Sequence, residues 1–282
     1  MDYSQFLSMW QEIGLFLVFL LVFLYDTFMP RKAAGEPNKA ASALPVFACI
    51  LFAVFTALGF TSLFGNPSGA FEGMYQNNPA IQGIKTILNL GVLIVLIQAI
   101  KWADSDFQRI RRGEFYELIL LTLFGMYLMI SAGHFLVFVI GLETASLPLA
   151  ALVAFEKNKY ESHEAAIKYI LTAVFSSAIF LFGLSFVYGL CGSLYYSNIA
   201  MAIATVENPT MLIVALAFVI AGFGFKLSLV PFHLWTADVY QGAPTPVTSY
   251  LSVISKGSAA FAFLVVLWQA FGMAYPGAWE WM

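Results

Sequence analysis

The chain has 282 residues, of which 61% are hydrophobic and only 10% are charged. Soluble domains carry roughly 25% charged residues, so this composition excludes an ordinary soluble domain and indicates a membrane protein. The formal net charge of -3 says little about partners, because in a membrane protein the position of each charge matters more than the sum. Cys49 and Cys191 have no metal-ligand spacing and no disulfide framework, so we interpret them as small hydrophobic residues.

Eight apolar segments are long enough to cross a bilayer, which takes about 20 mostly apolar residues. In chain order they are 11–29, 43–64, 84–102, 116–132, 134–154, 165–190, 210–235 and 248–272. Acidic residues precede the first segment and basic residues follow it, the reverse of a secretory signal, so we expect an uncleaved span. The sequence therefore predicts an all-α polytopic membrane protein with about eight transmembrane helices.

The basic residues of the connecting loops predict the orientation, because cytoplasmic loops carry an excess of lysine and arginine. The odd-numbered loops hold nine basic residues: Arg31, Lys32, Lys39, Lys101, Arg109, Arg111, Arg112, Lys157 and Lys159. The even-numbered loops hold one, Lys85, in loop two. This asymmetry predicts cytoplasmic odd-numbered loops and an N-terminus outside. The three remaining lysines fall inside predicted spans.

Four charged residues lie in apolar segments, where a charge at the bilayer centre costs at least ~2.5–3.5 kcal/mol. Glu143 falls near the middle of span five and Lys226 at comparable depth in span seven, so we expect them to pair. The plainer interpretation is a neutral packing glutamate and a lysine that snorkels to the interface. Lys256 lies too deep in span eight to snorkel easily, whereas Lys168, near the start of span six, is open to either interpretation.

Span seven is expected to be a broken helix. Gly222 and Gly224 weaken it before Lys226, and Pro231 removes a backbone hydrogen bond after it. Breaks inside membranes free backbone polar groups, and transporters commonly build ion sites from them. His233 follows the break and can pass a proton near neutral pH, although a structural, hydrogen-bonded histidine is the alternative. No spacing of possible ligands suggests a metal, and no glycine-rich phosphate loop suggests a nucleotide.

Residues 225–247, FKLSLVPFHLWTADVYQGAPTPV, closely resemble the antiporter-like membrane subunits of respiratory complex I and the related Mrp cation/proton antiporters. The DVYQGAP portion from Asp238 is most similar to the subunit N family, which includes mitochondrial NADH dehydrogenase subunit two. The resemblance extends over GLETASLP at 141–148, AAIKYIL at 165–171 and SKG at 255–257. It implies that Glu143 pairs with Lys226 and that Lys168 and Lys256 continue a polar axis. Ala237 departs from the family, which often has proline there.

The resemblance also implies a division of the chain. Residues 1–110 would form an N-terminal three-helix segment, and residues 111–275, with spans four to eight, would form the first antiporter-like five-helix repeat. Family members usually have about 14 spans in two inverted repeats, and the second repeat is missing from this sequence. We therefore expect either a fragment or a chain whose remainder is separate.

The implied function is a proton-translocating membrane-arm subunit of NADH-quinone oxidoreductase, with Glu143, Lys226, Lys256, Lys168 and His233 moving protons. No cofactor would sit on this chain; NADH, FMN, iron–sulfur clusters and quinone would belong to partner subunits. The partners would be other membrane subunits, including sister antiporter-like subunits, and lipid, with no nucleic acid. The location would be the cell inner (plasma) membrane, or the mitochondrial inner membrane for an organellar protein.

Two alternatives remain open at this point. An Mrp-type cation/proton antiporter would run on an ion gradient without a quinone-reducing partner, and co-purification with redox subunits distinguishes the two. The missing second repeat suggests a non-conducting assembly scaffold instead. The sequence leaves open the quinone type, the proton stoichiometry, the organism, and proton against sodium specificity.

Overall fold

A computed structural model of the chain describes residues 4–28, 39–61, 68–103, 111–206 and 209–272. Within these ranges eight helices are long and apolar enough to cross a membrane, which confirms the predicted fold class. The spanning segments are Trp10–Phe28, Ala43–Thr61, Pro79–Ala103, Arg112–Ile130, Phe135–Val153, Tyr160–Cys191, Pro209–Leu227 and Thr245–Phe271.

The elements follow one another as helices, interrupted once by a short hairpin. The first four helices and the hairpin are α1 (Ser4–Leu7), α2 (Trp10–Phe28), α3 (Lys39–Thr61), β1 (Ser68–Ala70), the 3-10 turn η2 (Phe71–Gly73), β2 (Tyr75–Asn77) and α4 (Pro79–Ala103). The next are α5 (Arg112–Ile130), α6 (Phe135–Val153), α7 (Tyr160–Cys191), α8 (Tyr196–Ile203), α9 (Pro209–Leu227) and α10 (Leu234–Gly242). The eighth span comprises α11 (Thr245–Ser249), the π-helical η4 (Tyr250–Ser255), α12 (Lys256–Val266) and the π-helical η5 (Leu267–Phe271).

Local sequence explains where several helices begin and end. Pro79 and Pro209 open α4 and α9, where the missing amide hydrogen of proline costs nothing. His134 caps α6, because its Nδ1 accepts the Leu136 amide hydrogen at 3.0 Å. Gly192 ends α7 in the left-handed conformation (φ 67°) that glycine adopts without strain. The main differences from the predicted spans are that α4 and α7 each begin five residues early and that α9 ends eight residues before the predicted end of span seven.

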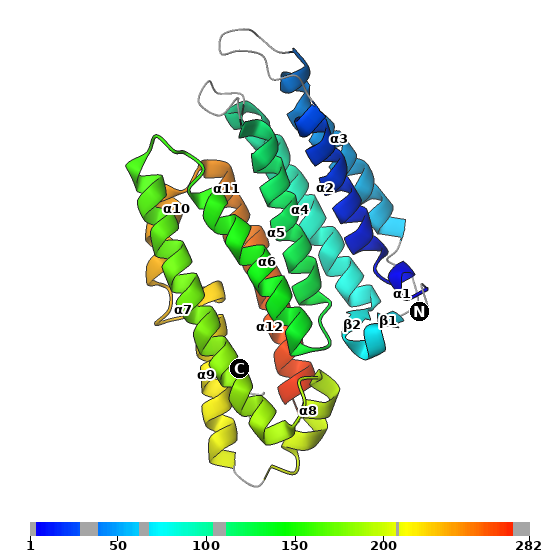
Figure 1. Cartoon of the computed structure of the whole chain (residues 1–282), viewed down its shortest axis with the longest axis vertical. Helices are drawn as coiled ribbons and strands as arrows, with labels where there is room; N and C mark the ends of the chain where they lie inside the picture. Colours follow the sequence, from blue (N-terminus) through cyan, green and yellow to red (C-terminus); the bar gives the residue numbers. More distant parts are fainter. Residues whose placement is uncertain (1–3, 29–38, 62–67, 104–110, 207–208, 273–282) are drawn as a thin grey trace.

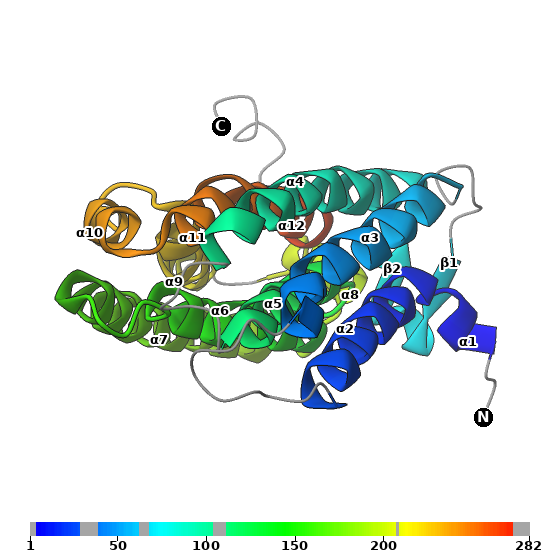
Figure 2. The same cartoon turned by 90° about the horizontal axis from the view of Figure 1, so that it is seen from above.

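The helices lie in two rows when the molecule is viewed from above (Figure 2). One row contains α7, α6, α5 and α2, and the other contains α10, α11, α12 and α4. The β1–β2 hairpin is antiparallel and lies beside α1, at one end of the helices (Figure 1). A single apolar core runs through both rows.

Glycines allow two pairs of helices to pack with their backbones in close contact. A Cβ at Gly141 of α6 would lie 2.5 Å from the Met129 backbone nitrogen of α5. A Cβ at Gly222 of α9 would lie 2.6 Å from the backbone nitrogen of Phe180 on α7. Small residues at such crossings let membrane helices associate through close van der Waals contact. These contacts fix α6 and α9, the two helices that carry Glu143 and Lys226.

The predicted break in span seven is confirmed. Helix α9 ends at Leu227, Ser228 takes a positive φ of 59°, the Val230–Pro231 peptide bond is cis, and α10 starts at Leu234. The interruption comes after Gly222 and Gly224 rather than at them, because both glycines are used for packing within an intact helix. Gly222 faces α7. Gly224 faces the Phe232 ring, and a Cβ added at Gly224 would lie 3.0 Å from that ring.

Candidate functional site: a buried lysine at a broken helix

Lys226 lies in the last turn of α9 and is only 5% exposed. Its ammonium donates to the hydroxyl of Ser146 at 2.9 Å and to the Tyr169 hydroxyl at 3.4 Å. Ser146 belongs to α6 and Tyr169 to α7, so three helices meet at the charge. A buried ammonium held by two neutral hydroxyls is incompletely compensated, because burying a charge is costly unless it is fully paired.

Glu143 is half-buried on α6, and its Oε1 accepts a hydrogen bond from Ser177 of α7 at 2.5 Å. Among the described residues Glu143 and Lys226 form no ion pair within 4.0 Å, so the contact that we expected between them is not made. The reason is geometric: each charge is held by a hydroxyl instead. The carboxylate still acts on the ammonium electrostatically.

The broken end of α9 is closed by contacts from α10. The Trp235 indole nitrogen donates to the Phe225 carbonyl at 3.1 Å, and Thr236 donates to the Ser228 hydroxyl at 2.7 Å. The Leu229 amide also donates to the Gly224 carbonyl at 2.8 Å. These bonds satisfy backbone and side-chain groups that would otherwise be exposed inside the membrane.

Lys168, which the sequence left open between a functional and a snorkelling lysine, is not buried within the chain. Its side chain is 41% exposed and forms ion pairs with Glu164 at 2.7 Å and with Asp238 at 2.5 Å. Glu164 lies one turn earlier on α7, and Asp238 is brought there by α10. The lysine therefore ties α10 to α7 at the surface and does not contact Lys226 directly.

Lys256 is the first residue of α12, directly after the π-helical turn η4, and it is half-buried. Its ammonium lies 5.2 Å from the centre of the Tyr240 ring, a cation–π distance. Single π-helical turns occur frequently at functional sites. Nothing in the sequence predicted this turn, because its residues include neither glycine nor proline.

His233 is exposed at the start of α10, and its side chain makes no capping bond. The structure therefore does not bring it into contact with the Lys226 cluster. Tyr169, Ser146 and Ser177 do contribute to the cluster, and none was predicted. The only signal was for Ser146, which lies three residues after Glu143 on the same helix.

Lys85 is the largest departure from the predicted arrangement, because its assignment to loop two is wrong. It lies inside α4, is fully buried, and forms an ion pair with Glu12 of α2 at 2.5 Å. Starting the third span at residue 84 placed Lys85 at the membrane surface. Glu12 at the start of the first span and Lys85 at the corresponding end of the third were a usable signal, because they are opposite charges at matching depth.

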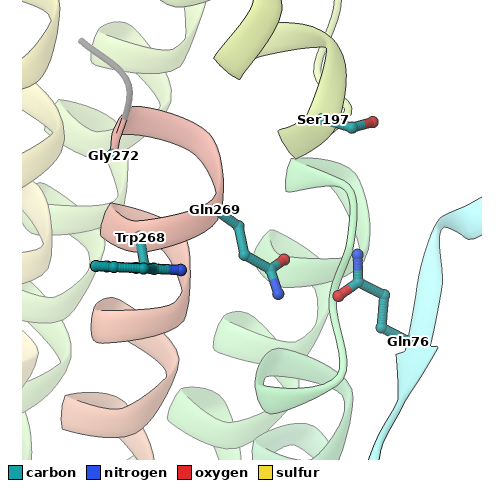
Figure 3. A pocket seen from close by; sticks show the side chains of 5 residues that line it. All are labelled: Gln76, Ser197, Trp268, Gln269 and Gly272. Atoms are coloured by element: carbon teal, nitrogen blue, oxygen red, sulfur yellow. The ribbon is translucent and has the colours of Figure 1, made fainter. Parts of the chain in front are cut away.

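The described residues contain no group of three or more His, Cys, Asp and Glu side chains that could hold a metal. An open pocket of about 470 Å³ lies elsewhere, lined by Gln76, Ser197, Trp268, Gln269 and Gly272. Figure 3 shows the Gln76 and Gln269 amides pointing toward each other across it. None of the charged residues discussed above lines this pocket, so we separate it from the candidate site.

The fold and the site together define a class: a polytopic helical membrane protein with a buried lysine beside a broken helix. The profile of the NADH:quinone oxidoreductase/Mrp antiporter transmembrane family matches residues 132–280, more than half of the chain. The chain belongs to this family.

Named relatives agree with this assignment. The chain is 48% identical over 272 residues to "NADH-quinone oxidoreductase subunit N" of Azobacteroides pseudotrichonymphae, and 47% identical to the subunit of that name from Phocaeicola vulgatus. Each match covers 96% of this chain and 55% of the relative, so the chain spans about half the length of these relatives. The resemblance to subunit N sequences is confirmed.

Solved structures show the same arrangement of helices. Respiratory complex I from Thermus thermophilus with bound aureothin has a matching chain at a TM-score of 0.71 and 31% identity, covering 90% of this chain and 52% of that one. A chain of the membrane-bound sulfane sulfur reductase, an archaeal respiratory membrane complex, matches at a TM-score of 0.75 and 20% identity. It covers 98% of this chain and 56% of that chain, and it supports the fold alone.

Proposed function

We propose that this chain is a proton-translocating membrane-arm component of an NADH-quinone oxidoreductase. The observation that carries the proposal is the Lys226 ammonium, buried at a helix break and held by the Ser146 and Tyr169 hydroxyls. Because its compensation is incomplete, small movements of Glu143 or of a positive neighbour change how tightly Lys226 holds its proton. Intramembrane ionisable residues that face a helical bundle commonly mark such proton relays.

Each of the other candidate residues has a different role in this proposal, according to its position. Glu143 sets the charge of the Lys226 site from α6, and Lys256 continues the path through the eighth span. Lys168 and His233 lie nearer the surface, where they would exchange protons with water. Residues 111–275 would act as one antiporter-like unit beside a three-helix segment at 1–110.

The proposal extends to the surroundings of the chain. Its partners would be other membrane subunits of the complex, including sister antiporter-like subunits, and NADH, FMN, iron–sulfur clusters and quinone would sit on partner subunits. The location would be the cell inner membrane, with the N-terminus outside. The excess of basic residues in odd-numbered loops supports this orientation, and the burial of Lys85 removes the single opposing residue.

The test is Lys226→Ala in the intact membrane complex, with proton transfer measured per electron and normalised to subunit content. Alanine cannot hold a proton, so proton transfer should fall while assembly continues. The matched control is Lys157→Ala, a lysine of the turn between α6 and α7. Unchanged proton transfer per electron in Lys226→Ala would remove this lysine from the mechanism. Transport that follows a sodium gradient without electron transfer would favour the antiporter instead.

A further inference from the structure

A second buried charge cluster lies outside the family match, among α2, β2, α4 and α5. Lys85 donates to Glu12 Oε1 at 2.5 Å and to the Tyr75 hydroxyl at 3.2 Å. Tyr75 in turn donates to Glu12 Oε2 at 2.8 Å. The three groups therefore close a hydrogen-bonded triangle in which Lys85 is fully buried and both Glu12 and Tyr75 are 2% exposed.

The triangle resembles the Lys226 site in its chemistry. Each site has a lysine on one helix, a glutamate on another and a tyrosine hydroxyl that accepts from the ammonium. At the second site Lys85 also lies 5.2 Å from the ring centre of Tyr127, which faces it from α5. The titratable groups that surround Lys85 are thus Glu12 from α2, Tyr75 from β2 and Tyr127 from α5.

Unpartnered polar groups flank Lys85 along one face of α4. Gln82 precedes it by three residues and Asn89 follows by four, so all three side chains share that face. The Gln82 Oε1 and Asn89 Nδ2 atoms are buried and have no partner among the described residues, although Tyr127 donates to Asn89 Oδ1 at 2.5 Å. Buried polar atoms in this state are typical sites of internal water, which usually makes about three hydrogen bonds.

We propose that Glu12, Lys85 and Tyr75 form a second proton-exchange site, connected by water at Gln82 and Asn89 to Tyr127. Moving one proton from Lys85 to Glu12 converts the ion pair into an amine and a carboxylic acid without changing the total charge. A proton taken up from water restores the Lys85 ammonium, and the Glu12 carboxylic acid releases its own proton to water, which regenerates the ion pair. Tyr75 keeps its phenol proton in both forms, since burial raises the pKa of the phenol well above the usual range and the Glu12 carboxylate of the ion-pair form raises it further.

A proton-exchange site and a purely structural ion pair can be distinguished by experiment. The intact complex would be assembled with Glu12→Gln or with Tyr75→Phe, and proton transfer per electron would be measured at equal subunit content. Tyr196→Phe is the matched control, because it removes another fully buried hydroxyl, one without a hydrogen-bond partner among the described residues. We expect a several-fold loss in both cluster variants and none in the control.

Infrared difference spectra between acidic and neutral pH provide a second readout on the same complexes. The wild type should show a carboxylic acid band that Glu12→Gln lacks. Normal proton transfer in both cluster variants, or the absence of this band, would overturn the proposal. The cluster would then have only a structural role. If Glu12→Gln fails to assemble, Tyr75→Phe decides, since it keeps the ion pair and the ring.

The inference shares proton transfer with the proposed function, but the two fail differently. Unchanged pumping in Lys226→Ala together with a Glu12 band would refute the proposed function and retain this site. Loss of pumping in Lys226→Ala, with unaffected cluster variants, would refute this site alone.

Discussion

Gly222→Ala tests whether helix packing controls the buried lysine. Gly222 lies one turn before Lys226, and its carbonyl accepts a hydrogen bond from Ser176 of α7. An added Cβ would lie 2.6 Å from the backbone nitrogen and Cβ of Phe180. Since ordinary contact begins near 3.4 Å, α9 and α7 would have to separate by about 0.8 Å. The hydrogen bond from Lys226 to Tyr169 is already long at 3.4 Å, so this separation breaks it.

The expected energies follow from two opposing effects. Overpacking typically costs ~1–3 kcal/mol, whereas replacing a helical glycine by alanine stabilises the helix by about 1 kcal/mol. Gly189→Ala on α7 is the matched control, because nothing lies within 4 Å of its added Cβ. The two variants should therefore differ by ~1–3 kcal/mol in the free energy of unfolding, with Gly222→Ala less stable.

The measurement is unfolding of the chain in mixed lipid–detergent micelles, together with proton transfer in the assembled complex. Gly222→Ala should lose both stability and proton transfer, while Gly189→Ala should keep both. Equal stability of the two variants would refute the close α7–α9 contact. Reduced stability with unchanged proton transfer would refute the link between that contact and Lys226.

Two further substitutions test the surroundings of the site. Lys168→Ala should change both stability and proton transfer only mildly, because exposed ion pairs contribute little; a loss of proton transfer as large as that of Lys226→Ala would contradict this. Trp235→Phe removes the donor to the Phe225 carbonyl at a cost of about 0.5–1.5 kcal/mol in unfolding free energy, and faster amide hydrogen exchange at residues 224–229 should accompany it. Unaltered exchange would show that this bond does not close the break.

Much of the fold could be predicted because the spans and breaks of helices depend on hydropathy and proline within a short stretch of sequence. The eight spans follow from apolar length, and the break after Lys226 follows from Pro231. The position of a hydroxyl relative to a charge is not local, since Ser177 reaches Glu143 from another helix. That is why a contact pair was expected, whereas Ser177 holds Glu143 and the Ser146 and Tyr169 hydroxyls hold Lys226.

Charge burial was harder to predict than helix position. Lys168 and Lys85 have similar apolar neighbours in the sequence, yet Lys168 is half-exposed and Lys85 is fully buried. The difference arises from packing: α10 leaves Lys168 open beside Asp238, whereas the hairpin that precedes α4 places Tyr75 over Lys85. Neither arrangement can be read from hydropathy.

The Lys168–Asp238 ion pair attaches α10, the helix after the break, to the outside of α7. Helix α10 is held to α7 by this exposed ion pair and to the end of α9 by the Trp235 bond, which is buried. Dissolved salt weakens exposed charge pairs over a Debye length of about 10 Å at 0.1 M, and buried bonds much less. A higher ionic strength at the membrane surface therefore weakens the Lys168–Asp238 ion pair and leaves the Trp235–Phe225 hydrogen bond largely unchanged. The position of α10 is thereby sensitive to the salt content of the solution that reaches this ion pair, although Lys226 at the end of α9 is buried.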